Sequence, residues 1–185
     1  MGRITTSHRT DAPLIPISMI SHGTLSCIDL EETRRFLEEV LGFEIVQYSP
    51  MSMCARKGTD HTYVILETGK PGHMQLLDHN GLDVPTREDV EAAHERLTAV
   101  KEQYGIRRIT PTKQQHGSYS FYFEDRDSNW WEIVQASNRG YSFTFDDATR
   151  RDITGRTDID AQEMKGHILD DDVWERIRAT ADPAP

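Results

Sequence analysis

The sequence predicts an α+β fold in which two βαβββ modules form a cupped mixed sheet around a metal site, followed by a C-terminal extension. One pattern, a strand, an amphipathic helix and three more strands, occurs twice, over residues of about 18–69 and 74–137. Each copy begins at a histidine, His22 or His79. Repetition of a whole module, rather than of a short motif, predicts two similar units that share one core.

The first module reads as a strand, a helix and three strands in that order. The residues that follow His22 alternate between polar and apolar side chains, as in a half-buried strand. The predicted helix has one apolar face and is followed by Gly42, an expected helix stop. That face consists of Phe36, Leu37, Val40 and Leu41, and the strands after it are FEIVQYS, SMCARKG and TYVILETG.

The second module repeats this order, and segments of different character flank the pair of modules. Its helix is followed by Gly105. The apolar face of that helix consists of Val90, Ala93, Leu97 and Val100, and the strands after it are IRRITPT, SYSFYFED and WWEIVQAS. Residues 1–17 are predicted to form a polar N-terminal arm, and residues 138–185 form the extension. We expect the extension to pack over the sheet, or onto a second subunit, and to help close the site.

Composition excludes several classes of protein. The chain has 185 residues and a net charge of −10, which argues against nucleic acid or an anionic membrane as a partner. No apolar run approaches membrane-spanning length, and residues 1–18 lack the apolar stretch of a secretory signal. The sequence has only two cysteines, Cys27 and Cys54, and their spacing is not that of a metal site. We therefore expect no disulfide framework and a reducing, cytoplasmic location.

Strand parity places the two histidines on the polar faces of their strands. His22 shares a face with Thr24, and His79 shares a face with Gly81. Leu25 and Leu82 face the other way, toward the helices. A histidine at the same position of both modules predicts a pair of ligands rather than two hydrogen-bonded structural residues.

Glu132 interrupts an otherwise apolar strand, where an unpaired carboxylate would be costly. A symmetric turn centred on Asp127 places Tyr122 opposite Glu132, with both side chains on one face. His22, His79 and Glu132 together are the ligand set of an Fe(II) site with three open positions, although Zn(II) accepts the same ligands. The alternative is that Glu132 pairs with one of the nearby arginines, Arg107 or Arg108.

These features resemble the vicinal oxygen chelate superfamily, and residues 116–132, HGSYSFYFEDRDSNWWE, resemble the signature of type I extradiol catechol dioxygenases. In that signature a Tyr precedes the ligand Glu by ten residues, as Tyr122 precedes Glu132. Arg126 and Ser128 stand where that family usually has Pro and Gly.

The resemblance implies a non-haem Fe(2+) enzyme that cleaves a catechol with O2. It implies that His116 or His61 transfers protons and that Tyr122 holds the ionised catechol oxygen, although His116 and His61 can also be exposed residues and Tyr122 a core aromatic. The chain length is similar to that of small L-DOPA 2,3-dioxygenases, and we expect a homodimer. The alternatives are a glyoxalase-like isomerase, a thiol transferase acting on an antibiotic, and a metal-free drug-binding resistance protein.

Overall fold

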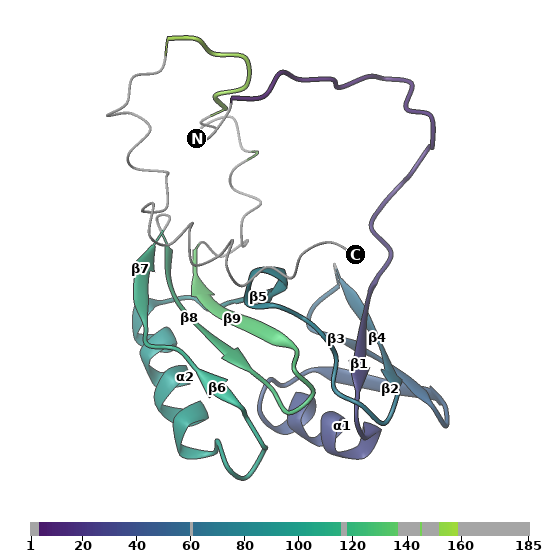
Figure 1. Ribbon diagram of the computed structural model, residues 1–185, viewed down its shortest axis with the longest axis vertical. Coiled ribbons are helices and arrows are strands. Elements are labelled where there is room, and N and C mark those ends of the chain that lie inside the picture. The colour runs from purple at the N-terminus through teal and green to yellow at the C-terminus, as the bar shows by residue number, and fades with distance from the viewer. Residues whose placement is uncertain (1–3, 60, 116–117, 137–144, 146–151, 159–185) are drawn as a thin grey trace.

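Two separate mixed sheets, each with a helix on one side, make up the body of the molecule (Figure 1). The structure is a computed structural model, and it describes residues 4–59, 61–115, 118–136, 145 and 152–158. In the first module, β1 lies parallel to β4, and the strand order of sheet A is β1-β4-β3-β2. The elements of this module are β1 (Gly23–Cys27), α1 (Leu30–Glu39), β2 (Glu44–Ser49), β3 (Ser52–Arg56) and β4 (Thr62–Glu67).

The second module has the same topology. Strand β5 lies parallel to β9, and the order of sheet B is β5-β9-β8-β6, with β7 also paired to β8. The segment IRRITPT, residues 106–112, is expected as one strand, but only Arg108–Ile109 of it form a strand, β6. Pro111 has no N–H for a sheet ladder, and the next strand, β7, begins at Lys113. The elements are η1 (Leu76–Asp78, a 3-10 turn), β5 (Asn80–Asp83), α2 (Arg87–Ala99), β6 (Arg108–Ile109), β7 (Lys113–Gln115), β8 (Ser118–Glu124) and β9 (Trp130–Gln135).

Local sequence signals explain where the helices begin and end. The Asp29 side chain caps α1, and Thr86 and Asp89 form a reciprocal capping box on α2. Gly42 and Gly105 both have φ of +65°, the left-handed conformation that glycine adopts without strain. Gly42 closes the turn that follows α1, whereas α2 ends at Ala99 and Gly105 closes the turns after it.

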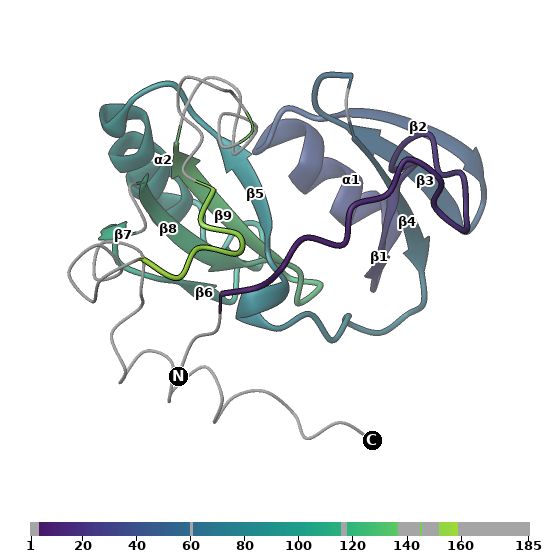
Figure 2. The same cartoon turned by 90° about the horizontal axis from the view of Figure 1, so that it is seen from above.

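A single cluster of buried side chains spans both modules. The Phe36 ring on α1 lies 6.2 Å from the Phe123 ring on β8, and the Phe43 ring lies 6.0 Å from the Trp131 ring on β9. Figure 2, seen from above, shows the two sheets side by side with α2 against sheet B and α1 against sheet A. The prediction of two βαβββ modules is confirmed, but their strands form two sheets rather than one cupped sheet.

The turn between β8 and β9 fastens the second module to the first. Asp127 is 1% exposed, and its carboxylate accepts hydrogen bonds from the Ile28 backbone N–H (2.8 Å) and the Thr33 hydroxyl (2.6 Å). Arg126 forms an exposed ion pair with Glu32 (3.0 Å). Ser128 has φ of +61° at the position where a glycine would be the unstrained choice. We call this set of contacts the turn clasp.

Other expectations concern features outside the two sheets. Cys27 and Cys54 are both free thiols, as predicted. Among the described helices, none is both long enough and apolar enough to cross a bilayer. Most of the predicted extension lies outside the described residues, and its packing stays a prediction.

Candidate metal centre

Glu132 lies in the middle of β9 with its side chain on the face of sheet B away from α2. Its direct neighbours across the strands are Tyr122 on β8 and Gly81 on β5, so the predicted register of the hairpin is confirmed. The Glu132 side chain is only 5% exposed. A Cβ atom added to Gly81 would lie 3.9 Å from Glu132 Oε2. The glycine therefore leaves open the space beside that oxygen, as glycines often do where a ligand approaches a strand.

His79 stands at the entrance of β5, directly after the 3-10 turn, and faces Glu132. Its Nδ1 donates a hydrogen bond to the Leu76 carbonyl oxygen (2.6 Å), which fixes the orientation of the ring. Its Nε2 lies 3.4 Å from Glu132 Oε2. The Tyr122 ring packs edge-on against the imidazole, with centroids 4.8 Å apart. Three side chains from three strand segments thus converge on one point of sheet B.

The charges of the pair are coupled. The hydrogen bond to Glu132 raises the pKa of His79 above its ordinary value, and burial opposes this shift. Burial disfavours the charge of Glu132, but hydrogen bonds from His79, Ser120 and Tyr122 hold the pKa of Glu132 below its ordinary value. Each side chain therefore favours the charged form of the other.

The donor set of this pair suits a divalent cation. A neutral His79 that donates through Nδ1 directs its Nε2 lone pair at a carboxylate oxygen, so two acceptors face each other and need a proton or a cation between them. A ring N–H bound to a backbone carbonyl is also the usual arrangement behind a metal-ligating histidine. The residues therefore fit two of the three predicted ligands.

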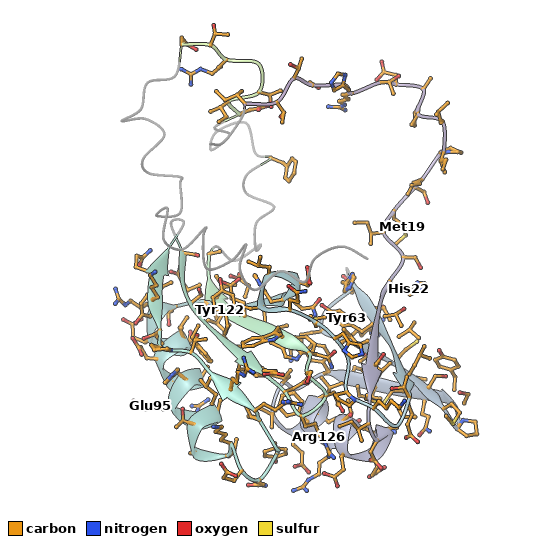
Figure 3. The ribbon with its side chains drawn as sticks, in the orientation of Figure 1. Met19, His22, Tyr63, Glu95, Tyr122 and Arg126 are labelled. Carbon is orange, nitrogen blue, oxygen red and sulfur yellow. The ribbon has the colours of Figure 1, made fainter. Side chains whose placement is uncertain are left out.

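The third predicted ligand, His22, lies elsewhere in the chain. It is exposed at the start of β1, where its Nδ1 is 2.8 Å from the Ser21 hydroxyl. Figure 3 shows His22 beside sheet A and Tyr122 within sheet B, well apart. Among the described residues, no three His, Cys, Asp or Glu side chains are close enough to hold one metal ion. One chain by itself therefore brings together His79 and Glu132 but not His22.

The structure places two of the other predicted side chains. His61 precedes β4, its ring lies edge-on to Tyr63 (4.6 Å), and its Nε2 lies 3.4 Å from the Cβ position of Gly23. His61 is therefore a neighbour of the residue that follows His22, in sheet A. Tyr122 contacts both members of the His79–Glu132 pair. His116 lies outside the described residues.

The alternative partners of Glu132 are engaged elsewhere. Arg107 and Arg108 both form ion pairs with Glu124, at 3.3 Å and 3.1 Å. Sequence reasoning did not assign a role to Ser120, which bonds to Glu132 from β8. The sequence did contain the information for Ser120. It lies two residues from Tyr122 on the same strand, so both side chains are on the same face.

Comparison with known proteins identifies the family. The profile of the Glyoxalase/Bleomycin resistance protein/Dioxygenase superfamily matches residues 19–133. The chain belongs to this superfamily. The match covers both modules and ends one residue after Glu132, so His79 and Glu132 both lie within it. No match was found among curated proteins.

Solved structures of the superfamily share the fold. The fosfomycin resistance protein FosX from Listeria monocytogenes, complexed with Mn(II) and sulfate, is 25% identical with a TM-score of 0.55; the match covers 66% of this chain and 94% of that one. FosX from Mesorhizobium loti is 24% identical, with a TM-score of 0.52 and coverages of 66% and 96%. Lactoylglutathione lyase from Agrobacterium tumefaciens is 19% identical, with a TM-score of 0.50 and coverages of 69% and 100%.

Proposed function

We propose that this chain is a metal-dependent enzyme of the Glyoxalase/Bleomycin resistance protein/Dioxygenase superfamily whose centre is built on His79 and Glu132. The observation that carries the proposal is the imidazole of His79, fixed through Nδ1, with its Nε2 aimed at a buried carboxylate. The open space beside Gly81 supports it, because a ligand needs access to that carboxylate. A relative at 25% identity is a complex with Mn(II), which supports a divalent ion in this fold.

We propose further that a second copy of the chain supplies His22 as the third ligand. His22 is exposed on sheet A, while the pair it would join lies on sheet B. A two-fold dimer that brings sheet A of one copy against sheet B of the other forms two equal sites. His61 would arrive together with His22, because its ring lies against Gly23. The proposed homodimer therefore also supplies a group for proton transfer.

The proposed reaction is extradiol cleavage of a catechol by O2, with L-DOPA as a candidate substrate and Fe(2+) as the metal. An Fe(2+) ion held here would supply open coordination positions and a change of oxidation state for O2 chemistry. The chain would contribute the rest: Glu132 and His79 would hold the ion. The single O–H of Tyr122, which is bonded to Glu132 in the free protein, would turn to an ionised catechol oxygen when the substrate binds. His61 or His116 takes up and returns the proton.

A second candidate is the opening of a small phosphonate antibiotic with Mn(II). It is favoured by the 25% identity to a FosX protein, one structure of which contains Mn(II) and 1S,2S-dihydroxypropylphosphonic acid. Both candidates use the same metal pair, and they differ in the substrate and in the need for O2.

One experiment separates these candidates. The protein is loaded with Fe(II) without oxygen, mixed with a panel of catechols that includes L-DOPA, and then exposed to O2. The proposal predicts a yellow ring-opened product with one O2 consumed per ring. If no catechol is cleaved, and fosfomycin is consumed with Mn(II), ring cleavage is rejected in favour of the second candidate.

A further inference from the structure

The segment before β1 exposes a run of apolar side chains. We call residues 4–22 the arm. Of the described backbone hydrogen bonds, the only one that joins the arm to another segment runs from the Gly155 N–H to the Thr5 carbonyl (2.9 Å). Five large apolar side chains of the arm are between 68% and 102% exposed, namely Leu14, Ile15, Ile17, Met19 and Ile20. The end of the segment expected to be polar, residues 1–17, thus exposes Leu14, Ile15 and Ile17, and the apolar run continues to Ile20. Such a run marks an interaction site.

The body of the molecule contains an apolar groove with no assigned role. The groove has a volume of about 580 Å³ and lies between the end of α1, the inner side of α2 and strands β5 and β9. Aliphatic and aromatic side chains form most of its wall, among them Val40, Phe43, Leu82, Val84, Leu97 and Ile133. Leu82 and Val84 remain partly exposed there, so the core is incomplete along this line.

We propose that the arm of one copy docks in this groove of a second copy, so that two chains exchange arms. Figure 1 shows the arm leaving β1 on the side of the body away from α1 and α2, whereas the groove lies beside these helices. Figure 2 agrees, since the arm passes above the sheets. Within one chain the arm thus points away from the groove, and a second copy is the partner that can receive it.

The composition of the arm favours docking through side chains. Pro13 and Pro16 lack backbone donors and hold Ala12 and Ile15 extended. The arm therefore cannot pair along its whole length as an added strand. Its restricted backbone also has less conformational entropy to lose when it binds.

The available area is sufficient for a stable dimer. Burial of one such side chain removes roughly 60–120 Å² from water, so five remove on the order of 300–600 Å². The groove wall loses at most on the order of 200 Å², so two-fold symmetry brings the total to on the order of 1,000–1,600 Å². Stable specific interfaces bury about 1,200–2,000 Å².

Cross-linking tests the docking position. In a Cys54→Ser background, Ile17→Cys is combined with Ala93→Cys in the groove, and thiols are joined with a short bismaleimide. The matched control replaces Ala93→Cys by Glu95→Cys, which is exposed on the outer side of α2 (Figure 3). The proposal predicts covalent dimers with Ala93→Cys and few with the control. Equal yields for both pairs, or a cross-link within single chains, would overturn it.

Sedimentation of the full-length protein tests the contribution of the arm. The double substitution Leu14→Ser and Ile17→Ser is expected to weaken the dimer by at least about 100-fold, with an unchanged far-UV spectrum. Ser18→Ala, an exposed polar site in the same arm, is the control and should leave the dimer intact. A monomeric wild-type protein, or an unchanged dimer after the double substitution, overturns the arm exchange. The two overturning results differ in their reach. A monomeric wild-type protein would also remove the proposed shared metal centre, whereas an unchanged dimer after the double substitution overturns the arm exchange alone.

Discussion

The buried Glu132 and the half-buried His79 face each other in a geometry that suits a cation between them. Replacing either with Ala removes one of the two ligands that a single chain holds together, and we expect bound Mn(II) or Fe(II) to fall to background in elemental analysis. Glu124→Gln is the matched control, because Glu124 is 5% exposed on the same face but binds Arg107 and Arg108. Full metal occupancy in His79→Ala would show that the ion binds elsewhere.

The raised pKa of His79 predicts how metal affinity depends on pH. Only the neutral imidazole can bind a metal, so a proton and the metal compete for Nε2 of His79. The pKa of His79 is raised above the ordinary 6.5, and the proton competes at every pH below that raised pKa. Glu132 has a lowered pKa and stays ionised in this range. Apparent affinity for Mn(II) should therefore rise about tenfold per pH unit up to the pKa of His79 and then level off.

Titration calorimetry in two buffers of different ionisation enthalpy checks this directly. At pH 6.5 the metal should displace a proton from His79, so the observed enthalpy should depend on the buffer. Identical enthalpies in both buffers would contradict the assignment of His79 as a ligand.

Tyr122 contacts both ligands without occupying a ligand position in the proposed centre. Tyr122→Phe keeps the ring against His79 and removes the hydroxyl, so we expect unchanged metal content. Turnover of the catechol should fall by about 10²–10⁴-fold, the usual contribution of a positioned proton donor or acceptor. Equal turnover in single-turnover assays of the two proteins would remove the phenol from the reaction.

At the scale of elements, the turn clasp is the buried polar connection between the modules, beside the Tyr63–Asn80 and Tyr104–Glu39 hydrogen bonds. Asp127→Ala leaves the Ile28 N–H and the Thr33 hydroxyl without their buried acceptor, and the free energy of unfolding should fall by about 2–3 kcal/mol. Arg126→Ala breaks only the exposed pair with Glu32, with an expected loss below about 1 kcal/mol. Urea unfolding measures both variants, and equal losses would mean that the clasp does not hold the modules together.

Most elements were predictable because their signals are local. Periodicity predicted the helices, glycine predicted the turns after them, and the symmetric turn predicted that Tyr122 faces Glu132. The early end of β6 at Ile109 also had a signal in Pro111, because proline has no N–H for the strand ladder. The turn clasp was not predictable, because Asp127 meets Ile28 and Thr33 only after both modules have folded.

At the scale of the whole molecule, the alternation of side chains along a strand predicts only part of the site. It predicts which side chains share a face within a sheet, and so it brought Tyr122 and Glu132 together. It does not predict how two sheets are placed, and His22 lies on sheet A while the pair lies on sheet B. A centre with three ligands therefore depends on the assembly, which no local pattern contains.

The central claim is that two chains share each metal centre, and mixing two inactive variants tests it most directly. His22→Ala retains the pair, and Glu132→Ala retains His22, so each alone should bind no metal tightly. Equal amounts, mixed and allowed to exchange subunits, give heterodimers in about half of the molecules, each with one intact site of two. The account predicts that Mn(II) binding and catechol turnover return to about a quarter of the wild-type level. No recovery, despite heterodimers demonstrated by native mass spectrometry, would contradict it.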